Sequence, residues 1–391
     1  MLCVSAPVAA HARPAWKRQI DRIVAGRHIG VAVHDEGRIL YRHDARYKRV
    51  PASNEKLLMS MALFDQLPPE STIKTRAFTT TAPVAGIVAG DLWVTGRGDP
   101  SLTAGGRFGR SLPFPATRLG RLANQIANEV TRIKGRVLAN TGYFNHDWFA
   151  PGWKSNFPAD EVALPSALSF EGNVDAGRHI KNPEWRVARS LKRKLEALGV
   201  QIGGAPGTGR MPRDVTLLTG IDSRPLSTFV RFMNRQSSNF FAEVLGKRLG
   251  AEHAGGPGTI AKGANALEAF ARRLGVDLTA HDASGLSYAN RVAPVGIVKM
   301  LTHVEEKELY YDALRGSLAA GGEGTLEDRL HDVRLRAKTG SLSGISALSG
   351  WVWLERERSW AEFSILSSGM PYYTAKGVED RIVRVIEARA N

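Results

Sequence analysis

The sequence is poor in cysteine and in long apolar stretches. Cys3 is the only cysteine among 391 residues, which excludes a disulfide framework, a cysteine-ligated metal site and thiol catalysis for the rest of the chain. After the first twelve residues, no stretch approaches the roughly 20 uninterrupted apolar residues of a membrane-spanning helix. We therefore expect a soluble protein with no metal, no cofactor and no transmembrane span.

Acidic residues are scarce relative to basic ones. The chain has 53 Lys and Arg against 38 Asp and Glu, a net charge of +15, which predicts attraction to polyanions. No nucleic-acid-binding module is recognisable, so we expect no nucleic-acid partner and take anionic envelope polymers as a plausible attractor. The densest basic group lies on the polar face of one expected helix, which more often means a solvated surface: Arg186, Arg189, Lys192, Arg193 and Lys194.

Residues 1–12 are mostly apolar and end in Ala10-His11-Ala12, like the end of a signal peptide, although the basic start of such a peptide is absent. We interpret this stretch as a truncated signal segment, with a frayed apolar terminus as the alternative. A signal segment would imply a periplasmic or otherwise extracytoplasmic protein whose mature form lacks Cys3.

Three short motifs rich in serine, lysine and asparagine follow one another along the chain. A triplet of this kind is typical of penicillin-recognising serine enzymes. The motifs are Ser53-Asn54-Glu55-Lys56, Ser237-Ser238-Asn239 and Lys338-Thr339-Gly340.

The first motif occurs twice, because Ser71-Thr72-Ile73-Lys74 has the same spacing. Residues 56–64 form an apolar run that predicts a buried helix, on which positions i and i+3 share a face. Ser53 and Lys56 would then point into one pocket, with the hydroxyl at the positive end of the helix dipole. Residues 75–81 are rich in β-branched residues and predict a strand, so Ser71 and Lys74 are poorly placed to act together.

Serine attacks a carbonyl only when a base removes its proton, and a lysine serves as that base only when its pKa is depressed. We expect Lys338 to place an ammonium beside Lys56 and so keep Lys56 neutral. Ser237 could pass a proton to a leaving amine, and Asn239 could donate to a substrate amide. Thr339 and Ser341 could hold a substrate carboxylate. Taken singly, each of these residues could equally be a helix cap or a strand end.

Further segments, in the same order, make the chain resemble the peptidase S13 family of D-alanyl-D-alanine carboxypeptidase/endopeptidases, the class C low-molecular-mass penicillin-binding proteins. The resemblance implies Ser53 as the acylated nucleophile and Lys56 as the base. It implies Ser237, Asn239 and Lys338 as further catalytic residues, Thr339, Gly340 and Ser341 as substrate-binding residues, and the backbone amides of Ser53 and Ser341 as the oxyanion hole. The matching segments are 51–58, 98–102, 151–153, 166–169, 282–287, 324–326 and 337–342.

The implied partners are peptidoglycan stem peptides as substrates and β-lactam antibiotics as inhibitors. Two positions depart from the family pattern: Asn140 stands where many relatives have an aspartate thought to bind a diaminopimelate ammonium, and Tyr288 stands where an arginine is common. Tyr288-Ala289-Asn290 also mimics the second motif of class C β-lactamases, but it lies too close to Lys338, and we interpret it as a loop with a shifted Arg291.

The 180 residues between Lys56 and Ser237 are far more than a connection between helices needs, so they must contain an inserted domain. We predict an α/β, multi-domain protein with a serine β-lactamase/DD-peptidase-like fold: an antiparallel sheet flanked by helices, an all-helical lobe and an inserted domain. The catalytic domain would comprise 13–71 and 177–391, and the inserted domain 72–176. We predict that the second nested insertion common in the family is missing, because the chain passes from Asn173-Val174 almost directly into an amphipathic helix.

The sequence favours a serine D-Ala-D-Ala carboxypeptidase, with endopeptidase action on cross-bridges left open. A serine β-lactamase is the nearest alternative, but it would need a deacylating base that we cannot identify. A non-catalytic peptidoglycan-binding protein is the alternative from another class, and it would be expected to have a broken triplet.

Overall fold

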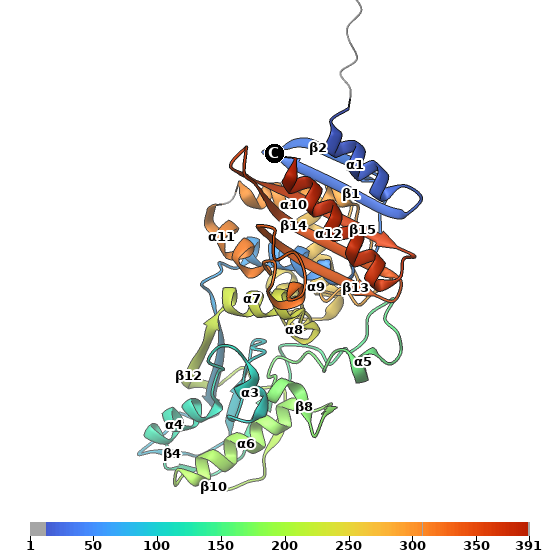
Figure 1. The fold of residues 1–391 in the computed structure, drawn as a ribbon. Coiled ribbons are helices and arrows are strands. Elements are labelled where there is room, and N and C mark those ends of the chain that lie inside the picture. Colours follow the sequence, from blue (N-terminus) through green and yellow to red (C-terminus); the bar gives the residue numbers. More distant parts are fainter. Residues whose placement is uncertain (1–12, 307, 390–391) are drawn as a thin grey trace, which may run out of the picture.

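The main sheet has five antiparallel strands in the order β13-β14-β15-β1-β2, so strands from both ends of the chain lie side by side (Figure 1). Glu36 and Gly37 form the turn between β1 and β2, with positive φ angles that suit a tight hairpin. The computed structural model describes residues 13–306 and 308–389. The strands are β1 (His28–Asp35), β2 (Arg38–His43), β13 (Leu335–Leu342), β14 (Ile345–Leu354) and β15 (Ser359–Ser368).

Helices cover both faces of this sheet. The terminal helices α1 (Ala15–Val24) and α12 (Tyr372–Ala388) pack together on one face, where their apolar side chains join those of the strands in one buried cluster. On the other face, α10 (Pro294–Glu305) packs against β15 and β1. The predicted antiparallel sheet flanked by helices is therefore confirmed.

The helical lobe continues from α10 and is built around α2, whose residues are almost all buried. Because α2 is apolar on every side, it lies in the centre of the lobe rather than on its surface. The surrounding helices also bury apolar residues against it. The lobe contains α2 (Glu55–Gln66), α7 (Leu226–Gln236), α8 (Asn239–Ala254), α9 (Ile260–Arg273), α10 and α11 (Glu308–Ser317).

The inserted lobe has its own core around a five-stranded mixed sheet in the order β11-β7-β5-β3-β12, a short parallel sheet β10-β6-β4, and the helices α4 and α6 (Figure 1). Its elements are β3 (Thr72–Thr79), β4 (Ile87–Val88), β5 (Leu92–Thr95), α4 (Leu119–Glu129), β6 (Arg132–Ile133), β7 (Val137–Asn140), α6 (Pro183–Ala197), β10 (Gln201–Ile202), β11 (Gly207–Gly209) and β12 (Thr216–Pro225).

The predicted boundary at residue 176 is too early, because α6, β10, β11 and β12 belong to the inserted lobe. β12 pairs with β3 over most of its length, from Thr216 with Thr79 to Pro225 with Thr72. The lobe therefore begins and ends on neighbouring strands, which return the chain to the helical lobe at α7. Sequence periodicity located α6 but could not show which core its apolar face would join.

Short elements connect the lobes. Residues 1–12, which contain the predicted signal segment and Cys3, lie outside the described residues. Within the described part of the chain, no helix has both the length and the apolar character needed to cross a membrane. The connecting elements are η1 (Ala52–Asn54), α3 (Arg107–Ser111), α5 (Phe157–Asp160), η2 (Glu171–Asn173), β8 (Val174–Asp175), β9 (Arg178–His179) and η3 (Gly324–Leu326).

Candidate active site

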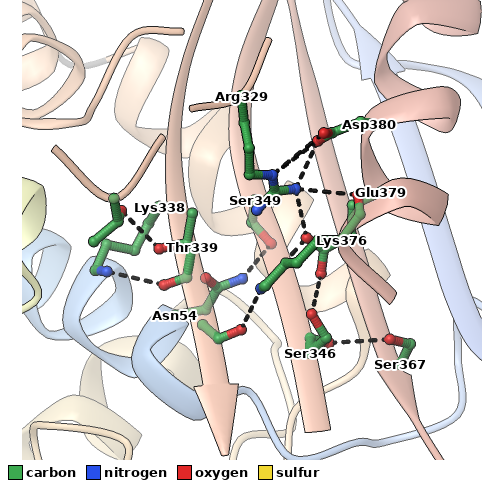
Figure 2. A network of polar contacts seen from close by, with 12 residues as sticks. Asn54, Arg329, Lys338, Thr339, Ser346, Ser349, Ser367, Lys376, Glu379 and Asp380 are labelled. Carbon is green, nitrogen blue, oxygen red and sulfur yellow. Dashed lines mark hydrogen bonds and ion pairs between the residues drawn. The ribbon is translucent and has the colours of Figure 1, made fainter. Parts of the chain in front are cut away.

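Ser53 lies in η1, the tight turn that opens α2. The preceding Ala52 has a positive φ of 47°, an uncommon conformation for a residue with a Cβ atom. Asn54 anchors the turn, because its Nδ2 donates to Ser349 Oγ of β14 at 2.8 Å (Figure 2). The turn thus holds the Ser53 hydroxyl at the N-terminal end of a buried helix, as the helical interpretation of this motif predicts.

Lys56 is fully buried one turn later, with its Nζ 3.1 Å from Ser53 Oγ. The same nitrogen donates to Asn239 Oδ1 at 2.8 Å and to the Ser284 carbonyl at 2.5 Å. Both of these partners are acceptors only. A neutral amine that donates its two protons to them keeps its lone pair for the proton of Ser53 Oγ. The arrangement therefore suits a lysine that acts as a base.

Burial lowers the pKa of Lys56 to about 8, although the nearby carboxyl groups of Asp282, Glu243 and Glu55 oppose this shift. The cause differs from the sequence-based expectation, in which the Lys338 ammonium depresses the pKa of Lys56. Instead, the repulsion between the two lysines contributes to the pKa of Lys338, which burial, Lys56 and Lys376 hold well below its ordinary value.

Two buried glutamates near Lys56 were not identified from the sequence. Neither carboxylate oxygen of Glu55 has a hydrogen-bond partner among the described residues, and burial raises its pKa well above the usual range. Glu243 accepts from the amides of Ala283 and Ser284, and burial raises its pKa to about 7. A neutral Glu55 does not stabilise an ammonium, so its shift helps Lys56 to lose its proton, whereas Glu243 ionises below the pKa of Lys56 and opposes that loss. Each glutamate lies in an otherwise apolar helical segment, which is the one signal that could have revealed it.

Asp282 organises the loop that supplies the Ser284 carbonyl. Its carboxylate accepts from Trp153 Nε1 at 2.7 Å, from Asn290 Nδ2 at 2.8 Å, and from the backbone amides of Gly285 and Ser287. A Cβ atom on Gly285 would lie 1.9 Å from the Ala52 carbonyl oxygen, so only glycine lets the loop pack against the nucleophile turn.

The second motif occupies the connection between α7 and α8. Ser237 caps α7 in the left-handed conformation, with φ 54°, and its Oγ accepts from Lys338 Nζ at 2.9 Å. Asn239 begins α8 and bridges the site, because its Oδ1 accepts from Lys56 while its Nδ2 donates to the Glu161 carbonyl at 3.2 Å. The structure therefore brings the first two motifs into direct contact.

The third motif lies on β13, the edge strand of the main sheet. Lys338 Nζ also donates to the Thr339 carbonyl, and Thr339 Oγ1 bonds Thr325 Oγ1 of η3 at 2.7 Å (Figure 2). A Cβ atom on Gly340 would lie 3.0 Å from the Ser53 amide nitrogen. The missing side chain lets the backbone just before Ser341 approach that of Ser53, as two oxyanion donors require.

A cavity of about 300 Å³ opens in front of these motifs and is lined by Ser53, Ser237, Asn239 and Ser341. Sequence reasoning missed several of its other lining residues, because they come from the loop at 154–161 and from the position just after the third matching segment, which no motif marks. They are Lys154, Phe157, Glu161 and Ser343.

The two positions that depart from the family pattern differ in location. Tyr288 lines the cavity, and its hydroxyl accepts from the Ser343 amide at 3.1 Å. Asn140 does not line it, and its Oδ1 accepts from the amides of Gly142 and Met211 in the inserted lobe. Arg291 also lies outside the cavity lining and donates to the carbonyls of Tyr288 and Asn290.

A groove of about 1030 Å³ adjoins the cavity and shares Glu161 and Asn239 with it. Aromatic side chains of the inserted and helical lobes line it, among them Phe108 and Phe240. Three arginines from α6 line it as well, and two of them, Arg189 and Arg193, are exposed to solvent, as expected for the basic face of that helix; the third is Arg186.

Comparison with known proteins identifies the family. The model of the D-Ala-D-Ala carboxypeptidase 3 (S13) family matches residues 17–180 and 168–389. The chain belongs to this family. It is a serine-type D-Ala-D-Ala carboxypeptidase by that membership, as its motifs predicted. Within the described residues, no group of three or more His, Cys, Asp or Glu side chains is arranged to hold a metal ion.

Two curated relatives extend over most of the chain. Carboxypeptidase DacB of Mycolicibacterium smegmatis is 28% identical over 358 residues, covering 85% of this chain and 74% of its own length. A D-alanyl-D-alanine carboxypeptidase of an Actinomadura species is 26% identical over 460 aligned residues, covering 94% of this chain and 82% of its own length. That alignment is longer than this chain, so the Actinomadura protein carries segments that this chain lacks.

Two solved structures share the fold. Penicillin-binding protein 4 (DacB) of Haemophilus influenzae has a TM-score of 0.79 at 19% identity and covers 94% of this chain and 98% of its own. A predatory peptidoglycan endopeptidase of Bdellovibrio bacteriovorus has a TM-score of 0.58 at 16% identity and covers 92% of each chain. The predicted fold class is therefore confirmed.

Proposed function

We propose that this carboxypeptidase removes the terminal D-Ala from peptidoglycan stem peptides through an acyl-enzyme on Ser53. The observation that carries the proposal is the contact of 3.1 Å between Ser53 Oγ and the buried Lys56 Nζ, together with the depressed pKa of that lysine. A base with a pKa near 8 removes a proton efficiently at neutral or mildly alkaline pH.

In the acylation step, neutral Lys56 takes the proton of Ser53 Oγ, and the oxygen attacks the carbonyl carbon of the penultimate D-Ala. The negative charge on the carbonyl oxygen is held by the N–H groups of Ser53 and Ser341. The proton that Lys56 took passes by way of Ser237 to the leaving nitrogen, so that D-Ala departs as an amine and Lys56 is neutral again. Lys338, 2.9 Å from Ser237 Oγ, supports this transfer.

Lys338 and Thr339 also receive the terminal carboxylate of the substrate. No acidic side chain of the described residues lies within 4.0 Å of Lys338 Nζ. Burial is the main reason why the pKa of Lys338 lies well below its ordinary value. A substrate carboxylate would supply the missing negative charge and favour the protonated lysine. Deacylation follows when Lys56 takes a proton from water, the hydroxide attacks the ester, and Ser53 leaves as the restored alcohol.

The rest of the substrate would extend across the cavity toward the groove. Glu161 and Lys154 offer one acidic and one basic group beside Tyr288, which suits a stem residue that carries both an ammonium and a carboxylate. The arginines of α6 would attract further carboxylates of the stem. Action on cross-bridges, which would make the enzyme an endopeptidase as well, requires a groove that admits a second stem.

A stem-peptide substrate implies an extracytoplasmic location, which we propose together with a signal segment in residues 1–12. β-Lactams should trap the acyl stage, because they present a reactive amide to the same serine. The Haemophilus penicillin-binding protein 4 has been solved in complex with a β-lactam. We also propose that the inserted lobe is a reduced form with one insertion instead of two.

The test is incubation with fluorescent penicillin, followed by a denaturing gel and intact-mass measurement. The wild type, Ser53→Ala and Ser71→Ala are compared. We expect a stable adduct in the wild type and in Ser71→Ala, and none in Ser53→Ala. Release of D-Ala from defined muropeptides would then measure the carboxypeptidase reaction directly.

The other outcomes separate the alternatives. A wild type that consumes penicillin without a lasting adduct would be a serine β-lactamase. A wild type that leaves penicillin intact, forms no adduct and still binds peptidoglycan would be a non-catalytic binding protein. An adduct that survives Ser53→Ala would contradict Ser53 as the nucleophile.

A further inference from the structure

The C-terminal helix α12 packs on the main sheet and brings a lysine into contact with the backbone of the third motif. Lys376 lies in the second turn of α12, is buried, and donates from Nζ to the Gly340 carbonyl oxygen at 3.0 Å (Figure 2). No sequence motif marks this residue, because it lies 36 positions after Gly340 and belongs to another element. Its contact reaches the same strand that carries Lys338, Thr339 and Ser341.

A closed network of charges holds the lysine in place. Glu379 Oε2 lies 3.5 Å from Lys376 Nζ and also accepts from Arg329 at 2.9 Å, while Glu379 Oε1 accepts from Ser346 Oγ at 2.5 Å (Figure 2). Arg329 in turn pairs with Asp380 at 2.6 Å. Burying an ammonium is costly unless it is paired in this way. The network therefore fixes the Lys376 ammonium against the Gly340 carbonyl oxygen.

The Gly340 carbonyl belongs to the same peptide unit as the Ser341 N–H. The single cis peptide bond among the described residues is Gly256-Pro257, so the Gly340–Ser341 peptide is trans, and its C=O and N–H point in opposite directions. With Lys376 on the carbonyl, the Ser341 N–H points away from α12. Ser341 lines the reaction cavity, and the Gly340 position lies against the Ser53 amide.

We propose that Lys376 is a positioning residue that orients and polarises the Gly340–Ser341 peptide, so that its N–H becomes a stronger and fixed oxyanion donor. This inference rests on the proposed acyl-enzyme function. A cation on a carbonyl oxygen withdraws electron density from the attached nitrogen, and hydrogen bonds in such a chain strengthen one another. A stronger Ser341 N–H donor stabilises the substrate oxygen most when negative charge develops on it. The effect of Lys376 is therefore larger on the rate of acylation than on substrate binding.

The peptide can be observed directly, since the sequence contains two Gly-Ser pairs, Gly340-Ser341 and Gly316-Ser317. Protein labelled with carbonyl-¹³C glycine and ¹⁵N serine should give one carbonyl-correlated amide signal for each pair, and Ser341→Ala assigns them by deleting one. We expect Lys376→Met to move the Gly340–Ser341 signal upfield in both ¹³C and ¹⁵N. The Gly316–Ser317 signal serves as an internal reference and should stay in place.

The matched control is Ser346→Ala. It removes the hydrogen bond that Ser346 Oγ donates to Glu379 in the same network, but it leaves the contact between Lys376 and Gly340. The rate constant of penicillin acylation and the dissociation constant of the preceding complex are measured for both variants. Because loss of a whole oxyanion donor costs about 10²–10³-fold in rate, weakening one predicts a fall of about tenfold in Lys376→Met. The dissociation constant should change little, Ser346→Ala should acylate like the wild type, and Lys376→Arg should recover the signal and much of the rate.

An unmoved Gly340–Ser341 signal, or a moved signal with an unchanged acylation rate, would overturn the inference. An equal loss of rate in Ser346→Ala would also overturn it, because it would show that only the integrity of the interface between α12 and the sheet matters. If Lys376→Met does not fold, Lys376→Gln replaces it, since a neutral amide cannot supply the charge. Absence of an adduct in the wild type would instead refute the proposed function and, with it, the catalytic role of Lys376.

Discussion

The chain contains the pattern Ser-x-x-Lys in two regions, and the structure gives the two copies opposite surroundings. Ser53 and Lys56 lie at the start of the buried helix α2 and are in contact with each other. Ser71 precedes β3 and Lys74 lies on that strand, with its side chain exposed. The same spacing brings two side chains together on a helix and directs them to opposite faces of a strand.

The comparison also shows what a lysine needs to become a base. The side chain of Lys74 is exposed to water. Lys56 is buried among acceptors and carboxyl groups, and the burial depresses its pKa to about 8. Spacing therefore places the pair, while the surroundings of the amine decide whether it can remove a proton.

The largest expected effect separates the two lysines. We expect Lys56→Met to lower the rate constant of penicillin acylation by about 10³-fold, within the range that a general base contributes. Lys74→Met should acylate like the wild type, because it removes an exposed side chain far from Ser53. Stopped-flow measurement of adduct formation, with thermal unfolding to verify the fold, would decide between them. Similar losses in both variants would remove the distinction between the copies.

A second prediction sharpens the comparison through pH. Because the folded-state pKa of Lys56 is about 8, acylation should rise with pH and reach a plateau above that value. Below pH 8 the rate should fall about tenfold per unit, as the proton occupies the lone pair that attacks Ser53 Oγ–H. The carboxylate of Glu243 raises the pKa of Lys56, so Glu243→Gln should shift the midpoint of the profile to lower pH. Lys74→Met should leave the whole profile unchanged. If Glu243→Gln did not shift the midpoint, that result would contradict the attribution of the midpoint to Lys56.

Much of the site was predictable wherever local sequence determines local structure. The apolar run after Ser53 indicated α2, and the amphipathic pattern after Asn173-Val174 indicated α6. In each case, neighbouring residues in the sequence carry the signal, and the periodicity of one element suffices.

The residues that escaped prediction act across long separations. Glu243 and the Ser284 carbonyl reach Lys56 from other elements, and Glu161 lies in a loop with no periodic pattern. The boundary of the inserted lobe failed for the same reason, since the pairing of β12 with β3 joins residues more than 130 positions apart. Asn140, which stands where relatives have an aspartate, bonds within its own lobe.

The smallest expected effect concerns the basic face of α6, where similar basic residues again lie in different surroundings, some inside the groove lining and one outside it. Arg189 and Arg193 line the groove beside the reaction cavity and have no acidic partner within 4.0 Å among the described residues, whereas Lys194 lies outside the groove lining. We expect Arg189→Glu/Arg193→Glu to raise the KM for muropeptides with free carboxylates by roughly threefold to tenfold, because each exposed charge contributes about 1 kcal/mol or less.

Lys194→Glu is the matched control on the same helix and should leave KM unchanged. Penicillin acylation should be the same in all three proteins, since penicillin is too small to span the cavity and the groove together. Added salt should reduce the difference in KM, because exposed charges are screened over about 10 Å at 0.1 M. Muropeptides whose carboxylates are amidated should show a smaller difference as well. An equal change in KM for Lys194→Glu would mean that the net charge of the protein, rather than the groove, attracts the substrate.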